Sequence, residues 1–244
     1  MSIPAHAVDI PDQVRALVPG ADLSAVWLND AGGVTFRGAR EDDVVFVKLQ
    51  PRGGETSVAE EVDRLRWASS FTAVPDVRHW GGDATHEWLV TTGMAGESAV
   101  SERGTRAPRQ AVRAIGAGLR QWHERLPVDA CPFTWDVSER IAAARARGIR
   151  VPAMLHDAPP VDRLVVCHGD ACAPNTLIDA GGRWAGHVDV GAAGRADRWA
   201  DIAVAVMSLE WNFGPGWDAE FFAAYGIEPD PVRQAFYRAL WNAT

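Results

Sequence analysis

Short apolar runs separated by turn residues occupy most of the first hundred positions, a pattern typical of antiparallel hairpins. Helical spacing interrupts these runs twice. A short amphipathic helix is predicted at 11–17, and a longer helix at 56–70, where Thr56 and Ser57 are the candidate N-caps. The predicted strands cover residues 25–28, 34–37, 44–49, 77–80 and 88–92.

The second half of the chain is mostly helical. A Gly-, Ser- and Arg-rich stretch at 93–106 precedes it, and we interpret this stretch as the boundary between an N-terminal lobe, 1–93, and a C-terminal lobe, 94–244. A strand-rich lobe followed by a helix-rich lobe predicts an α+β fold, with a five-stranded antiparallel sheet and a long helix in the smaller lobe. The predicted helices of the larger lobe cover 108–125, 138–147, 199–211, 218–225 and 231–240, and its short strands cover 164–167, 176–178 and 184–188.

The composition is that of a globular protein. The 244 residues are 47% apolar and carry a formal charge of −8, which disfavours disorder and a basic nucleic-acid-binding face. No apolar run could span a bilayer, the first residues lack the pattern of a secretion signal, and three cysteines are too few for a disulfide framework. We therefore expect a cytoplasmic protein, monomeric or weakly dimeric, without nucleic-acid or membrane partners. Its acidity suits a cationic small substrate.

Lysine usage singles out one position. Of the 24 basic residues, 23 are arginine and the only lysine is Lys48. Arginine is a planar fork and lysine a compact point charge on a thin stem. A single lysine among 23 arginines therefore indicates a position where arginine does not substitute. Its place near the end of a buried-type strand favours that interpretation over the alternative, a last solvated lysine.

Two acidic segments in the second half carry the candidate chemistry. The first contains Asp170 and Asn175, and the second starts at Asp189, 14 residues after Asn175; each follows an apolar strand. The spacing D-x-x-x-x-N followed by D-x-G is the arrangement used for phosphoryl transfer from ATP in kinase-type sites. There Asp170 would accept or orient the proton of the attacking hydroxyl, and Asn175 and Asp189 would hold Mg²⁺ with hard oxygen ligands. Taken singly, each aspartate could be a turn residue and His168 a buried structural histidine, but their common order favours the kinase interpretation.

Lys48 needs a carboxylate to hold it against nucleotide phosphates. Glu61 is the candidate, because it lies on the predicted helix after that strand, on the face shared with Leu65. The turn that ends at Gly32 and Gly33 would lie over the phosphates, its glycines letting backbone N–H groups approach. No Walker loop occurs, which excludes the P-loop class of ATP enzymes.

Together these segments resemble the aminoglycoside phosphotransferase family, the antibiotic kinases that share the bilobal protein-kinase-like fold. The resemblance rests on VVCHGDACAPNTLID and HVDVGAAGRADRWADIA, with FVK at Lys48, EVDRLRW around Glu61 and YGIEPDPVRQAFYRAL near the end. It implies a nucleotide-binding N-terminal lobe and a catalytic C-terminal lobe. It also implies ATP and Mg²⁺ as cofactors, with GTP left open, Asp170 as the catalytic carboxylate, and adenine bound by backbone at about Thr92 and Met94.

Three departures from the family bear on the acceptor. In members that act on deoxystreptamine drugs, an acidic segment before HGD, an arginine at the position of Met207 and an acidic C-terminus help to bind the polyamine. This chain has a short Pro-rich connector at 149–162, a methionine at 207 and a neutral last segment, and its 11 tryptophans could line a pocket for a flatter acceptor or fill the core.

These observations predict an ATP- and Mg²⁺-dependent O-phosphotransferase that acts on a hydroxyl of an aminoglycoside or related antibiotic, in resistance or in biosynthesis. Two alternatives stay open. One is a kinase of a nucleoside-type or other sugar-containing antibiotic or small metabolite, and the other is a nucleotide-binding module without transfer activity.

Overall fold

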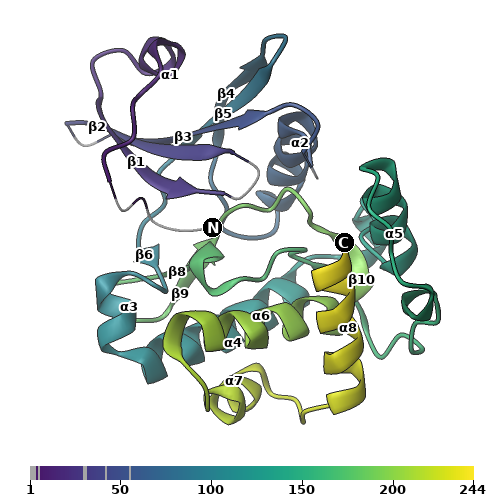
Figure 1. The fold of residues 1–244 in the computed structure, drawn as a ribbon. Helices are drawn as coiled ribbons and strands as arrows, with labels where there is room; N and C mark the ends of the chain where they lie inside the picture. The colour runs from purple at the N-terminus through teal and green to yellow at the C-terminus, as the bar shows by residue number, and fades with distance from the viewer. Residues whose placement is uncertain (1–3, 5, 30–31, 42, 55) are drawn as a thin grey trace. The chain divides into compact units, whose positions relative to one another are not determined.

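The computed structural model shows two compact units (Figure 1). Unit 1 comprises residues 1–69 and 75–94, and unit 2 comprises residues 70–74 and 95–244. The functional roles expected for 1–93 and 94–244 stay predictions. The residues that the structure describes are 4, 6–29, 32–41, 43–54 and 56–244.

Unit 1 is built on a five-stranded antiparallel sheet in the order β1-β2-β3-β5-β4. On the central strand β3, the alternate residues Val45, Val47 and Leu49 enter an apolar cluster with Val14 of α1. The residues between them therefore face the opposite side of the sheet. All the predicted strands and helices of this unit are confirmed: α1 Asp12–Leu17, β1 Asp22–Leu28, β2 Val34–Arg40, β3 Asp43–Pro51, α2 Val58–Ala68, β4 Val77–Gly82 and β5 His86–Thr92.

Helix α2 covers the face of the sheet opposite α1, where it contacts β4 and β5. It starts at a capping box in which Ser57 Oγ accepts from the Glu60 N–H at 3.2 Å and the Glu60 carboxylate accepts from the Ser57 N–H at 2.7 Å. Such a box satisfies backbone donors that the first turn leaves unpaired. The buried residues of α2 are Val58, Glu61, Val62, Arg64, Leu65 and Ala68.

Unit 2 is organised around the apolar helix α6, in which every residue from Trp199 to Leu209 is buried. Helix α8 packs against α6, and α7 packs against α4. The predicted helices of this unit are confirmed, with boundaries that shift by at most a few residues. They are α4 Pro108–Arg125, α5 Val137–Ala146, α6 Trp199–Phe213, α7 Asp218–Tyr225 and α8 Pro231–Ala243.

Short strands and one further helix complete unit 2. β7 (Leu164–Cys167) pairs with β10 (Gly194–Asp197), and β6 (Glu97–Ser98), β8 (Thr176–Ile178) and β9 (Trp184–His187) form a second small sheet. The sequence predicted neither β6 nor β10, because two to four partly polar residues carry no alternation and pair only through tertiary contacts. It also missed helix α3 (Glu102–Arg106), which lies within the stretch interpreted as a boundary.

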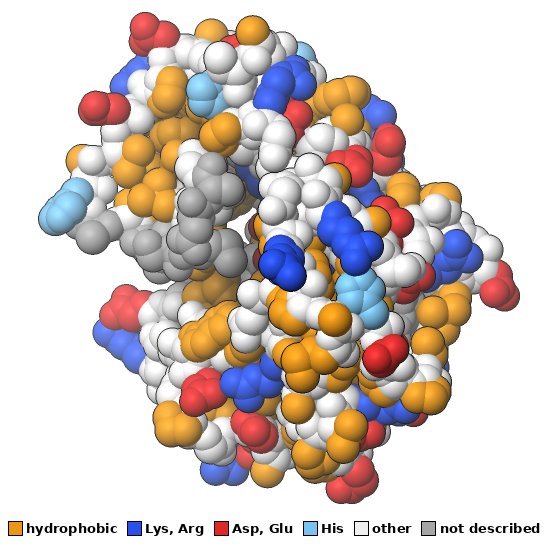
Figure 2. All heavy atoms as spheres, turned by 45° about the vertical axis from the view of Figure 1, so that its right-hand side comes forward, with side chains coloured by type: hydrophobic (Ala, Val, Ile, Leu, Met, Phe, Trp, Pro, Cys, Tyr) orange, Lys and Arg blue, Asp and Glu red, His pale blue; other side chains and the backbone are white. Residues whose placement is uncertain are grey.

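The structure shows where the tryptophans lie and how charged side chains are distributed on one face. Trp122, Trp135 and Trp199 are buried, whereas Trp80 and Trp211 are exposed, so tryptophans serve both core and surface. On the face shown in Figure 2, basic and acidic side chains are interspersed. Among the described residues, no helix combines the length and the apolarity needed to cross a bilayer.

A glycine in α4 gives a test of the packing between α4 and β9. Replacing a helical glycine by alanine ordinarily stabilises a protein by up to about 1 kcal/mol. At Gly118, however, a Cβ would clash with the Trp184 ring, because three ring atoms lie well inside the van der Waals contact distance. Overpacking typically costs about 1–3 kcal/mol, so we expect Gly118→Ala to lower the free energy of unfolding by about 1–2 kcal/mol in a urea titration. A variant more stable than the wild type would contradict the packing described.

Candidate active site

The single lysine forms an ion pair inside unit 1. Lys48 lies on β3, and its Nζ is 2.8 Å from Oε2 of Glu61 on α2. The Glu61 side chain is buried, while 20% of the Lys48 side chain is exposed. A charge-assisted hydrogen bond of this length fixes the direction of the lysine. The structure thus brings together the two residues that the sequence paired, and it leaves part of Lys48 accessible.

The turn between β1 and β2 is closed by its own hydrogen bonds. Gly33 N–H donates to the Asn29 side chain at 2.6 Å, and Gly32 N–H donates to the Asn29 carbonyl at 3.2 Å. Gly32 has a φ of +84°, in the region that favours glycine. Asp30 and Ala31 lie outside the described residues. A phosphate contact from either glycine amide would therefore need to displace Asn29.

The predicted adenine contacts lie where β5 ends. The Thr92 N–H donates to the Asp76 carbonyl, and the Thr92 hydroxyl accepts from the Asp76 N–H, both at 2.9 Å. Thr92 can therefore offer a ligand its carbonyl but not its amide. Within the described residues, no backbone hydrogen bond is formed by Met94.

In unit 2, Asp170 and Asn175 lie side by side in the loop after β7. The Asn175 amide nitrogen donates to both the backbone oxygen and Oδ2 of Asp170, each at 3.0 Å. This commits the nitrogen of Asn175 and leaves its side-chain oxygen available as a ligand. Oδ1 of Asp170 is buried and has no hydrogen-bond partner among the described residues.

His168 joins this loop to the segment that carries Asp189. Its Nδ1 accepts from the Asp170 N–H at 3.3 Å, and its Nε2 lies 3.0 Å from the Val188 carbonyl. The two partners require the proton on Nε2 and a lone pair on Nδ1. The histidine is fully buried, so it links the chain beside Asp170 to the residue before Asp189.

The backbone at both acidic segments adopts positive φ angles. Asp189 has a φ of +60°, which is uncommon for a residue other than glycine and costs conformational energy. Gly169 has a φ of +86°, and a Cβ there would clash with the carbonyl of Ala192. Only glycine fits at this position, because the loop of Asp170 packs backbone against backbone on the loop of Asp189.

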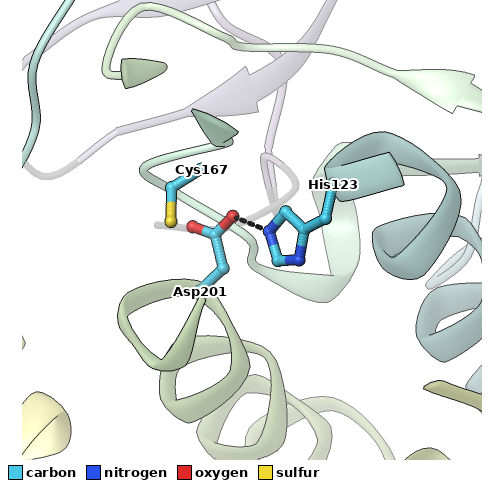
Figure 3. A group of neighbouring side chains, drawn as sticks. All are labelled: His123, Cys167 and Asp201. Carbon is cyan, nitrogen blue, oxygen red and sulfur yellow. Dashed lines mark hydrogen bonds and ion pairs between the residues drawn. The ribbon is translucent and has the colours of Figure 1, made fainter. Parts of the chain in front are cut away.

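Asp201 of α6 anchors the same loop, and Figure 3 shows its side chain hydrogen-bonded to His123. Its carboxylate accepts from the His168 N–H at 2.6 Å, from the Gly169 N–H at 2.9 Å, and from Nε2 of His123 at 2.9 Å. Nδ1 of His123 lies in turn 2.7 Å from the Tyr225 hydroxyl. Every one of these groups is buried. The carboxylate is therefore satisfied without a ligand.

The potential ligand atoms of His123, Cys167 and Asp201 lie within 4.8 Å of one another (Figure 3). Because the Asp201 oxygens are already used by three hydrogen bonds, this buried group serves the loop and makes a poor cation site. Burial by itself would raise the pKa of Asp201, but the interactions with His123 and with the His168 backbone hold that pKa below its ordinary value.

The oxygen atoms around Asp170 suit a divalent cation better than the group around Asp201 does. Burial, and then the negative charge of Asp189, raise the pKa of Asp170 above its ordinary value. Two interacting carboxylates, an orphaned carboxylate oxygen and a free amide oxygen form a set of hard oxygen donors. A cation there would offset the repulsion that the two aspartates exert on each other.

Lys48 and Glu61 therefore form one cluster in unit 1, and Asp170, Asn175 and Asp189 another in unit 2. Sequence reasoning missed the roles of Asp201 and His123. One signal was present for Asp201, which is the only charged residue between Trp199 and Leu209 in an otherwise apolar helix. A lone charge at such a position indicates a specific buried partner.

Comparison with protein families gives a match over most of the chain. The family described as "Phosphotransferase enzyme family" matches residues 15–237. An aminoglycoside 3'-phosphotransferase of Streptomyces fradiae is 33% identical, over 93% of this chain and 97% of the relative.

Solved structures give the same result for the fold. The crystal structure of an aminoglycoside-3'-phosphotransferase of type VIII superposes with a TM-score of 0.80 and 29% identity, covering 96% of this chain and 97% of the other. The aminoglycoside phosphotransferase APH(3'')-Id of Streptomyces rimosus, in complex with ADP and streptomycin, gives a TM-score of 0.68 and 30% identity, covering 88% and 94%. The predicted α+β, protein-kinase-like fold class is confirmed.

The buried carboxylate of Asp201 generates a prediction for stability against pH. Removing one partner from a buried charged cluster typically costs about 3–5 kcal/mol, so we expect Asp201→Asn to lower the free energy of unfolding by that amount at pH 7. Because the folded-state pKa lies below the ordinary value of about 4, the wild-type advantage is full above that value and is lost as the pH falls through the folded pKa.

Urea titrations from pH 7 down to the pH at which the wild type itself unfolds would measure this difference. The difference in free energy of unfolding between the wild type and Asp201→Asn should become smaller at the lowest pH values. A gap that stays constant with pH would mean that the ionised carboxylate is not what stabilises the loop.

Proposed function

The chain belongs to the family of phosphotransferase enzymes, and from this membership and the site geometry we propose that it is an ATP-dependent kinase of an aminoglycoside-type antibiotic. The observation that carries the proposal is the loop of unit 2, in which Asp170 and Asn175 are bonded to each other and His168 joins them to the segment of Asp189. The ADP in the complex of the Streptomyces rimosus relative supports an adenine nucleotide as the phosphoryl donor.

In the proposed reaction, the acceptor hydroxyl oxygen forms a bond to the γ-phosphorus of ATP. The bond from that phosphorus to the β–γ bridging oxygen breaks, ADP leaves, and the hydroxyl proton passes to a carboxylate oxygen of Asp170. Burial, the larger cause of the raised pKa of Asp170, favours uptake of this proton. Positioning and charge stabilisation do the remaining work, as in phosphoryl transfer generally.

Each of the other site residues has a proposed part in holding the nucleotide. Lys48, directed by Glu61, binds the phosphates as a point charge. The backbone of Thr92 and Met94 binds the adenine ring, and the turn at Gly32 and Gly33 lies over the phosphates once Asn29 moves aside.

A magnesium ion completes the proposed site. Asn175 and Asp189 would hold Mg²⁺, and the ion would supply positive charge to neutralise the phosphate oxygens. The side-chain nitrogen of Asn175 already donates hydrogen bonds to Asp170, which leaves the amide oxygen as the ligand atom and supports this assignment.

The acceptor is proposed from charge. Between Leu126 and Cys167 the chain carries five acidic and five arginine side chains, so this segment has no net negative charge with which to attract a polyamine. Met207 is buried in α6 and offers no polar contact. These features favour an acceptor with fewer amines, and the streptomycin bound to the Streptomyces rimosus relative is an example of such a drug.

The proposed role of Asp170 can be tested by substitution. We expect Asp170→Asn to bind nucleotide as the wild type does but to lose about 10²–10⁴ in kcat, the usual contribution of a positioned general base. Steady-state ATP consumption with streptomycin and with kanamycin as acceptors, together with product mass spectrometry, measures this. Turnover within about threefold of the wild type would remove Asp170 from the mechanism, and no phosphorylated product in any reaction of the wild type would favour a binding module without transfer activity.

The proposed acceptor preference can be tested by melting shifts. In the presence of Mg²⁺ and a non-hydrolysable ATP analogue, we expect streptomycin to raise the melting temperature more than kanamycin does. A ligand at a hundred times its Kd adds about 2.7 kcal/mol to stability, which is readily seen. Measurements at two salt concentrations would show how much exposed amine–carboxylate attraction contributes, because salt screens it. A larger shift and faster phosphorylation with kanamycin would overturn the acceptor proposal and leave the kinase proposal intact.

A further inference from the structure

A buried polar pair joins the start of helix α2 to the sheet of unit 1. Oε1 of Glu87, on β5, accepts from the backbone N–H of Val58 at 2.8 Å and from the Gln50 side-chain amide at 2.7 Å. The same Gln50 amide, on β3, donates to the carbonyl of Thr56 at 3.0 Å. Glu87 and Gln50 are both buried. Two strands are thus tied to the first turn of one helix.

These groups share a face of the sheet with the lysine. Gln50 lies two residues after Lys48 on β3, so their side chains leave the strand on the same side. Glu87 is the register partner of Gln50 on β5. On α2, Val58 and Glu61 are one turn apart and both are buried. The helix is therefore attached to the sheet at its first turn by Glu87, and one turn later by the pair of Lys48 and Glu61.

The first attachment determines where the second can form. The apolar contacts of α2 with the sheet are non-directional, so they allow the helix to slide or rotate at little cost. A hydrogen bond that the first backbone amide donates to a buried carboxylate allows neither, because breaking it leaves buried polar groups unpaired. A negative charge at a helix N-terminus is also favourable in itself. The position of Glu61, and through it the direction of Lys48, follows from this anchor.

We propose that Glu87, supported by Gln50, is a positioning residue for phosphoryl transfer, because it sets the register of α2 on the sheet and so directs Lys48 at the nucleotide phosphates. The inference rests on the proposed function of Lys48 and Glu61. In this inference Glu87 acts through the length of its side chain, which places an acceptor oxygen at the Val58 N–H. The charge of Glu87 is secondary, since its nearest cation, Nη1 of the half-exposed Arg52, is 3.8 Å from Oε2.

Helix α2 also offers a matched control. The capping box of Ser57 and Glu60 stabilises the same helix end, but its groups are exposed and all belong to the helix or its cap. Ser57→Ala removes about 1 kcal/mol of helix stability without releasing the helix from the sheet. A kinetic effect of Glu87 variants that Ser57→Ala does not share therefore comes from helix position.

The experiment compares Glu87→Asp, Glu87→Gln, Ser57→Ala and Glu61→Gln in the full chain, with folding checked by circular dichroism. The readouts are kcat, the KM values for ATP and acceptor, and the Kd for a non-hydrolysable ATP analogue. Aspartate keeps the charge but is one methylene too short to reach the Val58 N–H. Glutamine loses the charge but keeps an oxygen acceptor at the same distance.

We expect Glu87→Asp to lower kcat/KM for ATP at least tenfold while the acceptor KM stays within about twofold, and Glu87→Gln to restore kcat/KM to within about threefold of the wild type. Ser57→Ala should match the wild type. In the Glu61→Gln background, Glu87→Asp should add less than about threefold, because both changes act through one ion pair.

Normal ATP kinetics in Glu87→Asp together with a defect in Glu61→Gln would overturn the positioning role and leave the proposed function standing. Equal defects in Glu87→Asp and Ser57→Ala, or full additivity with Glu61→Gln, would also overturn it. Normal ATP kinetics in Glu61→Gln itself would refute the proposed role of the ion pair, and with it the inference. If Glu87→Asp does not fold, Gln50→Ala takes its place, with the same expected split between the ATP and acceptor parameters.

Discussion

A charge buried in the middle of a protein must be satisfied by the groups around it, and Asp201 is satisfied by the backbone of the loop that it supports. An isolated carboxylate in an apolar helix such as α6 would be strongly unfavourable. Two consecutive amides and the His123 imidazole offset that cost, and each of these groups is fixed in return. The site of unit 2 depends on these hydrogen bonds, because the loop that they fix carries Asp170. His168 links the same loop to the segment of Asp189 through its hydrogen bond to the Val188 carbonyl. Rigidity at the site thus originates in a buried carboxylate that holds the backbone next to Asp170.

Unit 1 follows a similar principle with different groups. There the buried carboxylate of Glu87 receives the first amide of α2, and a helix is held in place instead of a loop. In both units a buried carboxylate accepts backbone N–H groups at the start of the segment that carries proposed functional side chains. The strained backbone at Asp189 is maintained by such surroundings, since a positive φ at a residue other than glycine persists only where neighbouring structure holds it.

The sequence predicted those parts of the fold and site that local pattern specifies. Helix α4 starts at Pro108, and helix α7 ends at Tyr225 before Gly226, both as predicted, because proline and glycine mark helix ends. The spacing of Asp170, Asn175 and Asp189 was readable because a short loop holds the first two and a strand pair brings the third close. β10, Asp201 with His123, and Glu87 with Gln50 were not predicted, since their partners lie tens of residues away along the chain. The hydrogen bonds by which Asn29 satisfies the amides of Gly32 and Gly33 were also not predicted, although Asn29 lies only three and four residues away.

The position of the only lysine also makes the chain a reporter of its own unfolding. An endoprotease specific for lysine has one peptide bond to cut, the bond between Lys48 and Leu49. That bond lies within β3, which is hydrogen-bonded to β2 on one side and to β5 on the other. A protease needs an extended, unpaired segment, so cleavage requires this central strand to leave the sheet. When opening and closing are fast relative to cleavage, the rate of appearance of two fragments measures the population in which unit 1 is open. A ligand that binds through Lys48 would slow that cleavage by stabilising the strand that carries it.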